Sequence, residues 1–137
     1  MTAKEAAERW AREWERAWRD HDADRVAMLY ADGSGFRPGP FRDRRDPGEY
    51  AAWAFGSEDA GGEIRFGEPI VVGDGTAAVE WWAIVSDSGG PETTIAGVSL
   101  LRFDGDGLVV DERDYWNVDE TRHEPHEGWG TSLRSAP

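Results

Sequence analysis

Residues 100–117 read LLRFDGDGLVVDERDYWN, two β-rich runs joined by the turn sequence DGDG. Asp and Gly in such short connections are typical of hairpins between antiparallel strands. The same pattern continues upstream, where GDG and DSGG separate further β-rich runs. The sequence therefore predicts a meander of four antiparallel strands, at residues 64–72, 76–85, 93–103 and 108–118.

The chain before these strands is predicted to be mostly helical. Apolar residues recur at helical spacing over residues 3–19. A shorter apolar pattern over residues 24–30 follows, with Asp24 as its expected N-cap, and Pro47 is well placed to begin a third helix over residues 47–56. Residues 33–46 are dense in Gly, Pro and Arg and predict a loop with at most a short edge strand around Phe36.

Helices followed by a strand meander define the fold class. Three N-terminal helices and a mostly antiparallel sheet indicate an α+β fold, in which a strongly curved sheet wraps the helices to bury its apolar face. A length of 137 residues suits one domain. We assign residues 1–118 to this domain and residues 119–137 to a polar C-terminal tail, which lacks periodicity and is expected to fray.

Composition excludes several classes of function. Twenty-eight acidic residues against 15 Lys and Arg give a net charge of −13, which disfavours nucleic acid and membrane partners. The absence of Cys excludes thiolate chemistry. The charged N-terminus and the lack of a long apolar run favour a cytoplasmic protein. We expect no cofactor, because no helix follows the Gly-rich turns, and no metal, because a tail without structure cannot fix ligands such as His123 and His126.

Two stretches resemble the nuclear transport factor 2-like superfamily, and its SnoaL-like (polyketide cyclase-like) branch in particular. They are ERAWRDHDADRVAMLYAD at residues 15–32 and the hairpin sequence at residues 100–117, and the resemblance extends over about residues 5–118. It implies a cone-shaped α+β barrel that encloses a hydrophobic pocket and pairs into homodimers through its outer sheet face. Members include ketosteroid isomerases, polyketide cyclases, dehydratases, epoxide hydrolases and proteins that only bind, so the fold does not name the function.

The resemblance disfavours ketosteroid isomerisation. Isomerases of the superfamily use a Tyr on the first helix, an Asp base in a loop and a protonated Asp on the penultimate strand. The matching positions in this chain fall near Trp14, Pro38 and Ser99. None of these side chains can remove a carbon-bound proton or polarise a carbonyl in the same way.

The last strand carries the candidate catalytic residue. Because side chains alternate along a strand, Glu112, Asp114 and Trp116 share one face, and the resemblance implies that this face lines the pocket and that an acid/base residue, here Asp114, lies on it. Burial beside Trp116 would raise the pKa of Asp114. Alternatively, Asp114 is a structural partner of Arg37 or Arg102. Glu112 either cooperates with Asp114 or is solvated at the mouth of the cone.

The other candidate pocket residues are mostly aromatic. Trp14, Trp18 and Trp53 are expected to pack with Trp116 as an aromatic wall of the cavity, with a solid core as the alternative, and Tyr30 either contacts a ligand or fills the core. Ser99 is a further candidate. Trp81 and Trp82 point to opposite faces, so that only one meets the pocket.

An Arg-rich stretch follows Phe36, and two interpretations remain open for it. The guanidinium groups either clamp a carboxylate or phosphate ester or pair internally with neighbours such as Asp43 and Asp46. The residues are Arg37, Arg42, Arg44 and Arg45.

Two functions of different class follow from these residues. The first is a cofactor-free acid/base enzyme, an isomerase, cyclase, lyase or hydrolase, that acts on a hydrophobic small molecule with Asp114 as proton carrier. The second is a non-catalytic ligand-binding or dimerisation module. An open cavity with an unpaired carboxyl at its floor would favour the enzyme, and a filled cone or a fully paired carboxyl would favour the module.

Overall fold

The computed structural model describes residues 1–134. Its helices and strands, in chain order, are α1 (Ala3–Asp20), α2 (Ala23–Ala27), β1 (Tyr30–Arg37), α3 (Pro47–Gly56), β2 (Glu63–Phe66), β3 (Ile70–Gly73), β4 (Thr76–Ser86), β5 (Glu92–Phe103) and β6 (Val109–Asp119). The sheet has the order β1-β6-β5-β4-β2, and β3 also pairs with β4. All pairs are antiparallel except that of β1 with β6. The predicted α+β class, with a curved and mostly antiparallel sheet, is confirmed.

The helices begin and end at recognisable capping residues. Thr2 and Glu5 form a capping box at the start of α1. Asp22 caps α2, where the sequence predicted Asp24, and α2 ends at Ala27. It is shorter than predicted because Tyr30 already begins β1. Pro47 is the first residue of α3, as predicted, with Asp46 as its N-cap.

Two strand predictions need correction. The segment around Phe36 is an eight-residue strand, β1. It forms because its backbone pairs in parallel with β6, the last strand of the chain. The predicted strand over residues 64–72 is divided into β2 and β3. The division falls at residues 67–69, which include a proline that has no N–H for the ladder.

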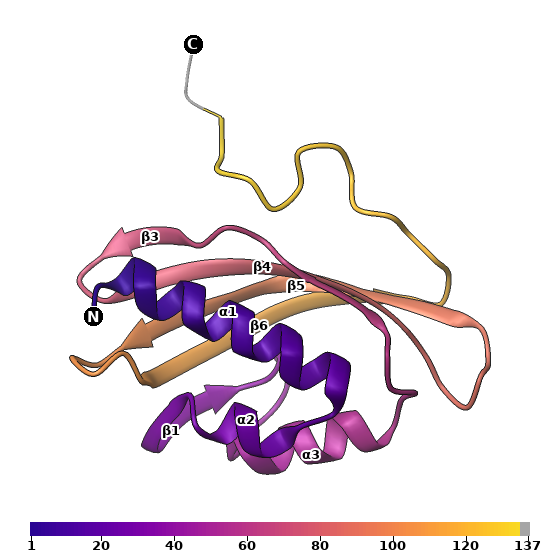
Figure 1. Ribbon diagram of the computed structural model, residues 1–137, viewed down its shortest axis with the longest axis horizontal. Helices are drawn as coiled ribbons and strands as arrows, with labels where there is room; N and C mark the ends of the chain where they lie inside the picture. The colour runs from indigo at the N-terminus through magenta and orange to yellow at the C-terminus, as the bar shows by residue number, and fades with distance from the viewer. Residues whose placement is uncertain (135–137) are drawn as a thin grey trace.

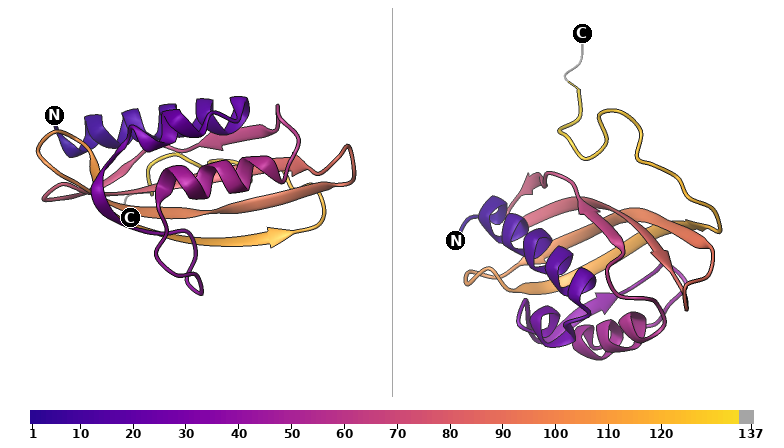
Figure 2. Two further views of the ribbon diagram at one scale, coloured as in Figure 1. Left: turned by 90° about the horizontal axis from the view of Figure 1, so that it is seen from below. Right: turned by 45° about the vertical axis from the view of Figure 1, so that its right-hand side comes forward.

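Helix α1 lies across one face of the sheet, as Figures 1 and 2 show, and contacts β2, β3, β4 and β5. Its buried stripe includes Trp10, Trp14 and Ala17. Along β4 the alternation is resolved: Trp81 is buried on the inner face, and Trp82 lies on the outer face, where it meets Trp129. The apolar core therefore lies between α1 and the concave side of the sheet.

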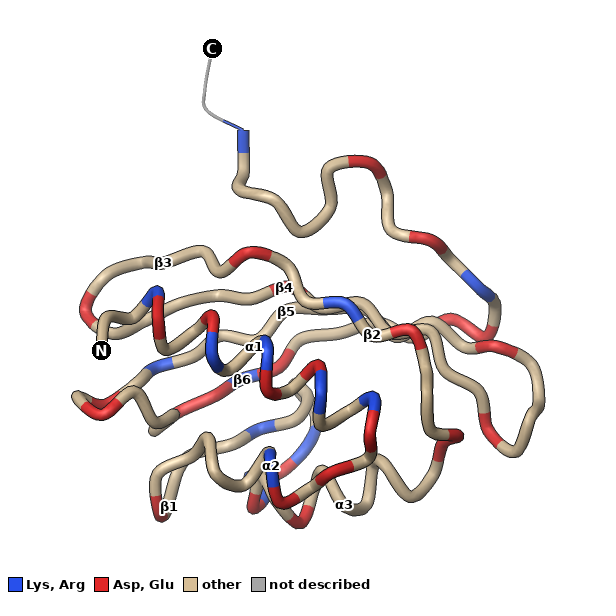
Figure 3. The backbone as a smooth tube through the Cα atoms, viewed as in Figure 1, with Lys and Arg blue, Asp and Glu red and all other residues tan. Residues whose placement is uncertain are grey.

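Charged residues are sparse on the neighbouring strands β4 and β5 (Figure 3). Strand β4 carries only Glu80, and β5 carries only Glu92 and Arg102. Most of the acidic surplus lies on helices, turns and the tail. Two acidic residues of β6, Glu112 and Asp114, are exceptional because they face the interior. Within residues 1–134 no helix is long and apolar enough to cross a membrane.

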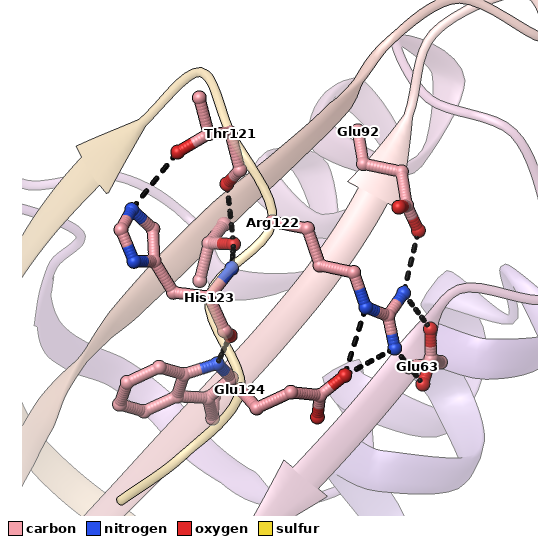
Figure 4. A network of polar contacts seen from close by, with 8 residues as sticks. Glu63, Glu92, Thr121, Arg122, His123 and Glu124 are labelled. Carbon is pink, nitrogen blue, oxygen red and sulfur yellow. Dashed lines mark hydrogen bonds and ion pairs between the residues drawn. The ribbon is translucent and has the colours of Figure 1, made fainter.

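The segment after β6 contacts the sheet instead of fraying. Arg122 pairs with Glu63, Glu92 and Glu124, with Nη1 2.6 Å from Glu63 and 2.7 Å from Glu92 (Figure 4). The indole of Trp82 donates to the carbonyl oxygen of His123 at 2.8 Å. Local polarity predicted disorder, but carboxylates from β2 and β5 gather around the Arg122 guanidinium. The last three residues of the predicted tail lie outside the described residues.

Candidate functional site

A cavity of about 200 Å³ lies between α1, α3 and the inner faces of β4, β5 and β6. Its walls are mainly aromatic. The aromatic lining residues are Trp10, Trp14, Trp18, Tyr50, Trp53, Phe55, Phe66, Trp81 and Trp116. The charged lining residues are Arg42, Glu58, Glu112 and Asp114. A chamber of this composition excludes the solid-core alternative and suits a ring-containing apolar ligand.

Glu112 forms the floor of the cavity and is 1% exposed. The hydroxyl of Tyr30 donates to its Oε1 at 2.5 Å. That hydroxyl accepts hydrogen bonds from the indoles of Trp10 at 3.1 Å and Trp14 at 2.9 Å. The Tyr30 hydroxyl thus donates one hydrogen bond and accepts two, so it has no proton left for a ligand. Tyr30 lies behind the cavity wall and positions Glu112, a correction to its expected place in the pocket.

Asp114 faces the cavity two residues further along β6 and is half-buried. Ser99, its partner in the β5–β6 register, donates to Oδ1 at 2.6 Å. The Ser99 hydroxyl accepts from the indole of Trp81 at 3.0 Å. This chain of donors fixes the carboxyl without neutralising it.

Asp114 has no cationic partner in the described part of the chain. No Arg, Lys or His nitrogen lies within 4.0 Å of its carboxyl oxygens. Arg102 donates instead to the carbonyl oxygen of Asp74, and Arg37 is exposed. The ion-pair alternative for Asp114 is therefore wrong, because both candidate arginines lie away from the concave face of the sheet.

The two carboxyl groups differ in protonation. Burial, and next the charge of Asp114, raise the pKa of Glu112 well above its usual range. Burial raises the pKa of Asp114 to about 6, while interactions with Glu112 and Ser99 act in the opposite direction. The interaction between the two carboxyl groups thus raises the pKa of Glu112 and lowers that of Asp114, which favours the proton on Glu112. The pair combines an acid and a base on one strand face.

Replacing Asp114 with Asn is expected to stabilise the protein at neutral pH. The folded pKa of about 6 exceeds the ordinary 3.8, so the native state binds more protons than the unfolded state between these values, and stability falls as the pH rises through them. Above this pH window the ionised Asp114 lowers the free energy of unfolding by roughly 2 to 3 kcal/mol. Melting temperatures at about pH 4 and about pH 7.5 test this: Asp114→Asn gains only at the higher pH, and Asp111→Asn, on the outer face, changes little. A steep fall for Asp114→Asn would reveal a lost partner.

The mouth of the cavity is formed by the loop between β1 and α3. The indole of Trp116 donates to the carbonyl oxygen of Pro38 at 2.6 Å. The guanidinium of Arg42 lies 5.6 Å from the ring centroids of both Trp53 and Trp116. Arg42 therefore contacts both indoles, whereas the predicted direct packing of Trp53 with Trp116 is not found among the described aromatic pairs. Trp53 is 54% exposed.

The remaining aromatic wall is continuous from α1 to β4. Trp14 packs against Trp18 with centroids 6.4 Å apart, and Trp18 packs against Trp81 at 5.8 Å. Of the residues predicted for the pocket, all but Tyr30 line it; they are Trp14, Trp18, Trp53, Ser99, Glu112, Asp114 and Trp116.

Sequence reasoning missed Glu58 as a cavity residue. The indole of Trp18 donates to its carboxyl at 2.5 Å, and burial raises its pKa. Glu58 follows the end of α3, where neither helical nor strand periodicity assigns a direction to a side chain. The sequence therefore carried no signal that could place it.

Three helices and a curved, mostly antiparallel sheet, with an aromatic cavity between them, define the α+β architecture of this chain. The model of the SnoaL-like domain matches residues 11–112. The chain belongs to this SnoaL-like family, within the NTF2-like superfamily. No curated protein matches it in sequence.

Solved structures confirm the fold at low sequence identity. An LEH-like epoxide hydrolase from M. tuberculosis is 19% identical, with a TM-score of 0.60 over 84% of this chain and 82% of that one. The epoxide hydrolase/cyclase-like enzyme SalBIII, which has a role in pyran ring formation in the polyether salinomycin, is 16% identical to this chain. Its TM-score is 0.66, over 85% of this chain and 93% of that one. A Delta 5-3-ketosteroid isomerase from Mycobacterium sp. is 20% identical, with a TM-score of 0.62 over 85% and 95%.

Proposed function

We propose that the protein is a cofactor-free acid/base enzyme that acts on a hydrophobic small molecule, with Asp114 as the base and Glu112 as the acid. The observation that carries this proposal is the pair of carboxyl groups on the cavity surface, which have no ion-pair partner among residues 1–134 and whose mutual interaction raises the pKa of Glu112 and lowers that of Asp114. Such a pair costs stability, and a purely structural role does not account for that cost.

The pair couples proton uptake to proton release. The charge of Asp114 is one cause of the raised pKa of Glu112. When Asp114 accepts a proton from a substrate or from water, that charge disappears and Glu112 becomes a stronger acid. Proton removal at one substrate atom therefore promotes donation at another, within one apolar chamber in which charge interactions are strong.

Opening of an epoxide is a reaction with these requirements. Asp114 removes the proton of an attacking hydroxyl group or water, the oxygen forms a bond to one epoxide carbon, and the C–O bond that breaks leaves an oxygen that accepts the proton of Glu112. Two of the structural relatives are named as epoxide hydrolase or hydrolase/cyclase-like enzymes, which supports this choice. Isomerisation of a ketosteroid is less well supported, because the positions near Trp14, Pro38 and Ser99 carry no matching acid or base.

A substrate panel tests the proposed activity. It contains aryl epoxides, hydroxy-epoxides and a Δ5-3-ketosteroid, with products followed by chromatography. We expect turnover of an epoxide, with kcat/KM rising with pH through about 6 as Asp114 ionises, and a loss of about 10² to 10⁴-fold in Asp114→Asn. Asp111→Asn, on the outer face of the same strand, is the matched control. Turnover that survives Asp114→Asn would refute its role, and a panel that binds without turnover would favour the binding module.

We also infer a homodimer that forms through the outer sheet face, as the resemblance implies. Leu100 and Tyr115 on this face are 42% and 45% exposed. These side chains lie beside the region around Trp82 that the tail covers. Light scattering at micromolar concentration should give twice the mass of the chain, and Tyr115→Arg should give the single mass. A monomeric wild type would contradict the dimer.

A further inference from the structure

The loop after β1 brings one arginine to the cavity and leaves its neighbours outside. Arg42 is half-buried and lines the cavity, whereas the adjacent Phe41 is fully exposed. Arg44 and Arg45 are also exposed and do not line the cavity. Arg42 is therefore the cation of this loop that a ligand in the cavity can reach.

The guanidinium of Arg42 has no acidic partner among the described residues. The chain has 28 acidic residues for 15 basic ones, yet no carboxylate oxygen lies within 4.0 Å of this group. Internal pairing with Asp43 or Asp46, one of the two interpretations of the arginine cluster, is thus wrong for Arg42. Arg44 differs, since its side chain donates to the backbone carbonyls of Gly33 and Ser34.

The stacking of Arg42 leaves its hydrogen-bond donors unused. The guanidinium carbon of Arg42 lies over the rings of both Trp53 and Trp116, 5.6 Å from each centroid, so both indoles make cation–π interactions with it. Its N–H groups point outward in the plane of the guanidinium. None of them donates a hydrogen bond to a residue that the structure describes. The two rings hold the fork in a defined orientation and leave its edge for a planar anion.

A second unused donor lies nearby. Tyr50 lines the same cavity, and its hydroxyl makes no hydrogen bond with the described part of the chain. Burial raises the pKa of this hydroxyl, and among the charges that act on it Arg42 opposes the rise most strongly. The phenol therefore lies in the field of the guanidinium and remains a neutral donor at physiological pH.

We propose that Arg42 and Tyr50 bind a carboxylate of the ligand at the mouth of the cavity, so that the substrates are hydrophobic carboxylic acids. A carboxylate is planar, carries a single charge and matches the guanidinium fork in bidentate geometry. The apolar body of the acid fills the aromatic chamber, and its uncharged reactive part reaches Asp114 and Glu112. Turnover of such acids rests on the proposed function, whereas their binding does not.

Calorimetric titration with a matched pair of probes tests the subsite. The probes are 2-naphthylacetic acid and its carboxamide, which share their shape and differ in charge above pH 7. A surface of net charge −13 repels the acid, so any preference for the acid must come from a local group. We expect the wild type to bind the acid about tenfold more tightly than the amide, and Arg42→Met to lose roughly tenfold for the acid and less than about twofold for the amide.

Two further variants act as comparisons. Tyr50→Phe should weaken acid binding by about three- to fivefold. Arg45→Met is the matched control, because Arg45 also lies over Trp53, with its guanidinium carbon 6.0 Å from the ring centroid, but it does not line the cavity. Acid binding should be unchanged in this control.

The outcomes separate this proposal from the proposed activity. Equal losses of both probes in Arg42→Met would mean that Arg42 only holds the loop, and would overturn the carboxylate subsite. A wild type that binds neither probe, or prefers the amide, would overturn it as well. All titrations are repeated in Asp114→Asn, where no turnover is expected and acid binding should persist. Selective acid binding without turnover of any panel substrate would count against the proposed activity alone.

Discussion

Replacing Tyr30 with Phe is expected to lower the free energy of unfolding by about 3 to 5 kcal/mol, although the change removes a single oxygen. The hydroxyl joins three buried groups: it accepts from Trp10 and Trp14 and donates to Glu112. Without it, two buried indole N–H groups and a buried carboxyl oxygen lose the hydrogen bond that each makes with this hydroxyl. Each such group costs about 1 to 3 kcal/mol.

Chemical denaturation of Tyr30→Phe and Tyr50→Phe measures this effect with a matched control. Both changes delete one phenol oxygen beside the same cavity, but the Tyr50 hydroxyl bonds to no described residue, so its loss should cost less than about 1 kcal/mol. Equal effects of the two variants would show that the Tyr30 network does not stabilise the fold. Because the Tyr30 hydrogen bond lowers the pKa of Glu112, Tyr30→Phe should also make Glu112 a weaker acid.

The arrangement of the candidate site on β6 was predictable from local sequence. Alternation along a strand puts Glu112, Asp114 and Trp116 on one face without any knowledge of the partners, and the structure has all three at the cavity. The same rule left Trp81 and Trp82 undecided, because both faces of β4 carry an aromatic residue. Only the packing of α1 on one side selects Trp81.

The partners of the two carboxyl groups could not be predicted locally. Tyr30 reaches Glu112 across 82 residues of sequence, by way of a parallel β1–β6 pair that a Gly- and Pro-rich segment did not reveal. Ser99 meets Asp114 through the register of β5 and β6. Register and parallel pairing arise from long-range contacts, for which spacing in the sequence carries no signal.

The position of Arg42 was unpredictable for a related reason. A loop has no periodicity, so four arginines within nine residues were equivalent in the sequence. The indole of Trp116 anchors the loop at the carbonyl oxygen of Pro38. This contact from the far end of the chain accompanies the placement of Arg42, and not Arg44 or Arg45, against the cavity.

Gly97→Ala is expected to destabilise the protein by about 3 kcal/mol or more, because β5 and β6 approach too closely there for a side chain. Gly97 pairs with Trp116 across the two strands. A Cβ atom at position 97 would lie 2.2 Å from the carbonyl oxygen of Tyr115 and 2.6 Å from Cβ of Trp116. Both atoms are fixed to the β6 backbone, so the clash cannot be relieved by rotating a side chain, and the strand itself must move.

Gly105→Ala provides the control, since a Cβ atom there meets no other atom within 4 Å, and it should be neutral or stabilising by up to about 1 kcal/mol. Denaturation curves with Trp fluorescence compare the two variants, and equal stability would show that the close approach at Gly97 is unimportant. The segment displaced by Gly97→Ala carries Asp114 and Trp116, so cavity ligands should bind more weakly even where the variant remains folded. A glycine at this point of β5 therefore allows the close strand approach that holds Asp114 and the indole of Trp116 on the concave face.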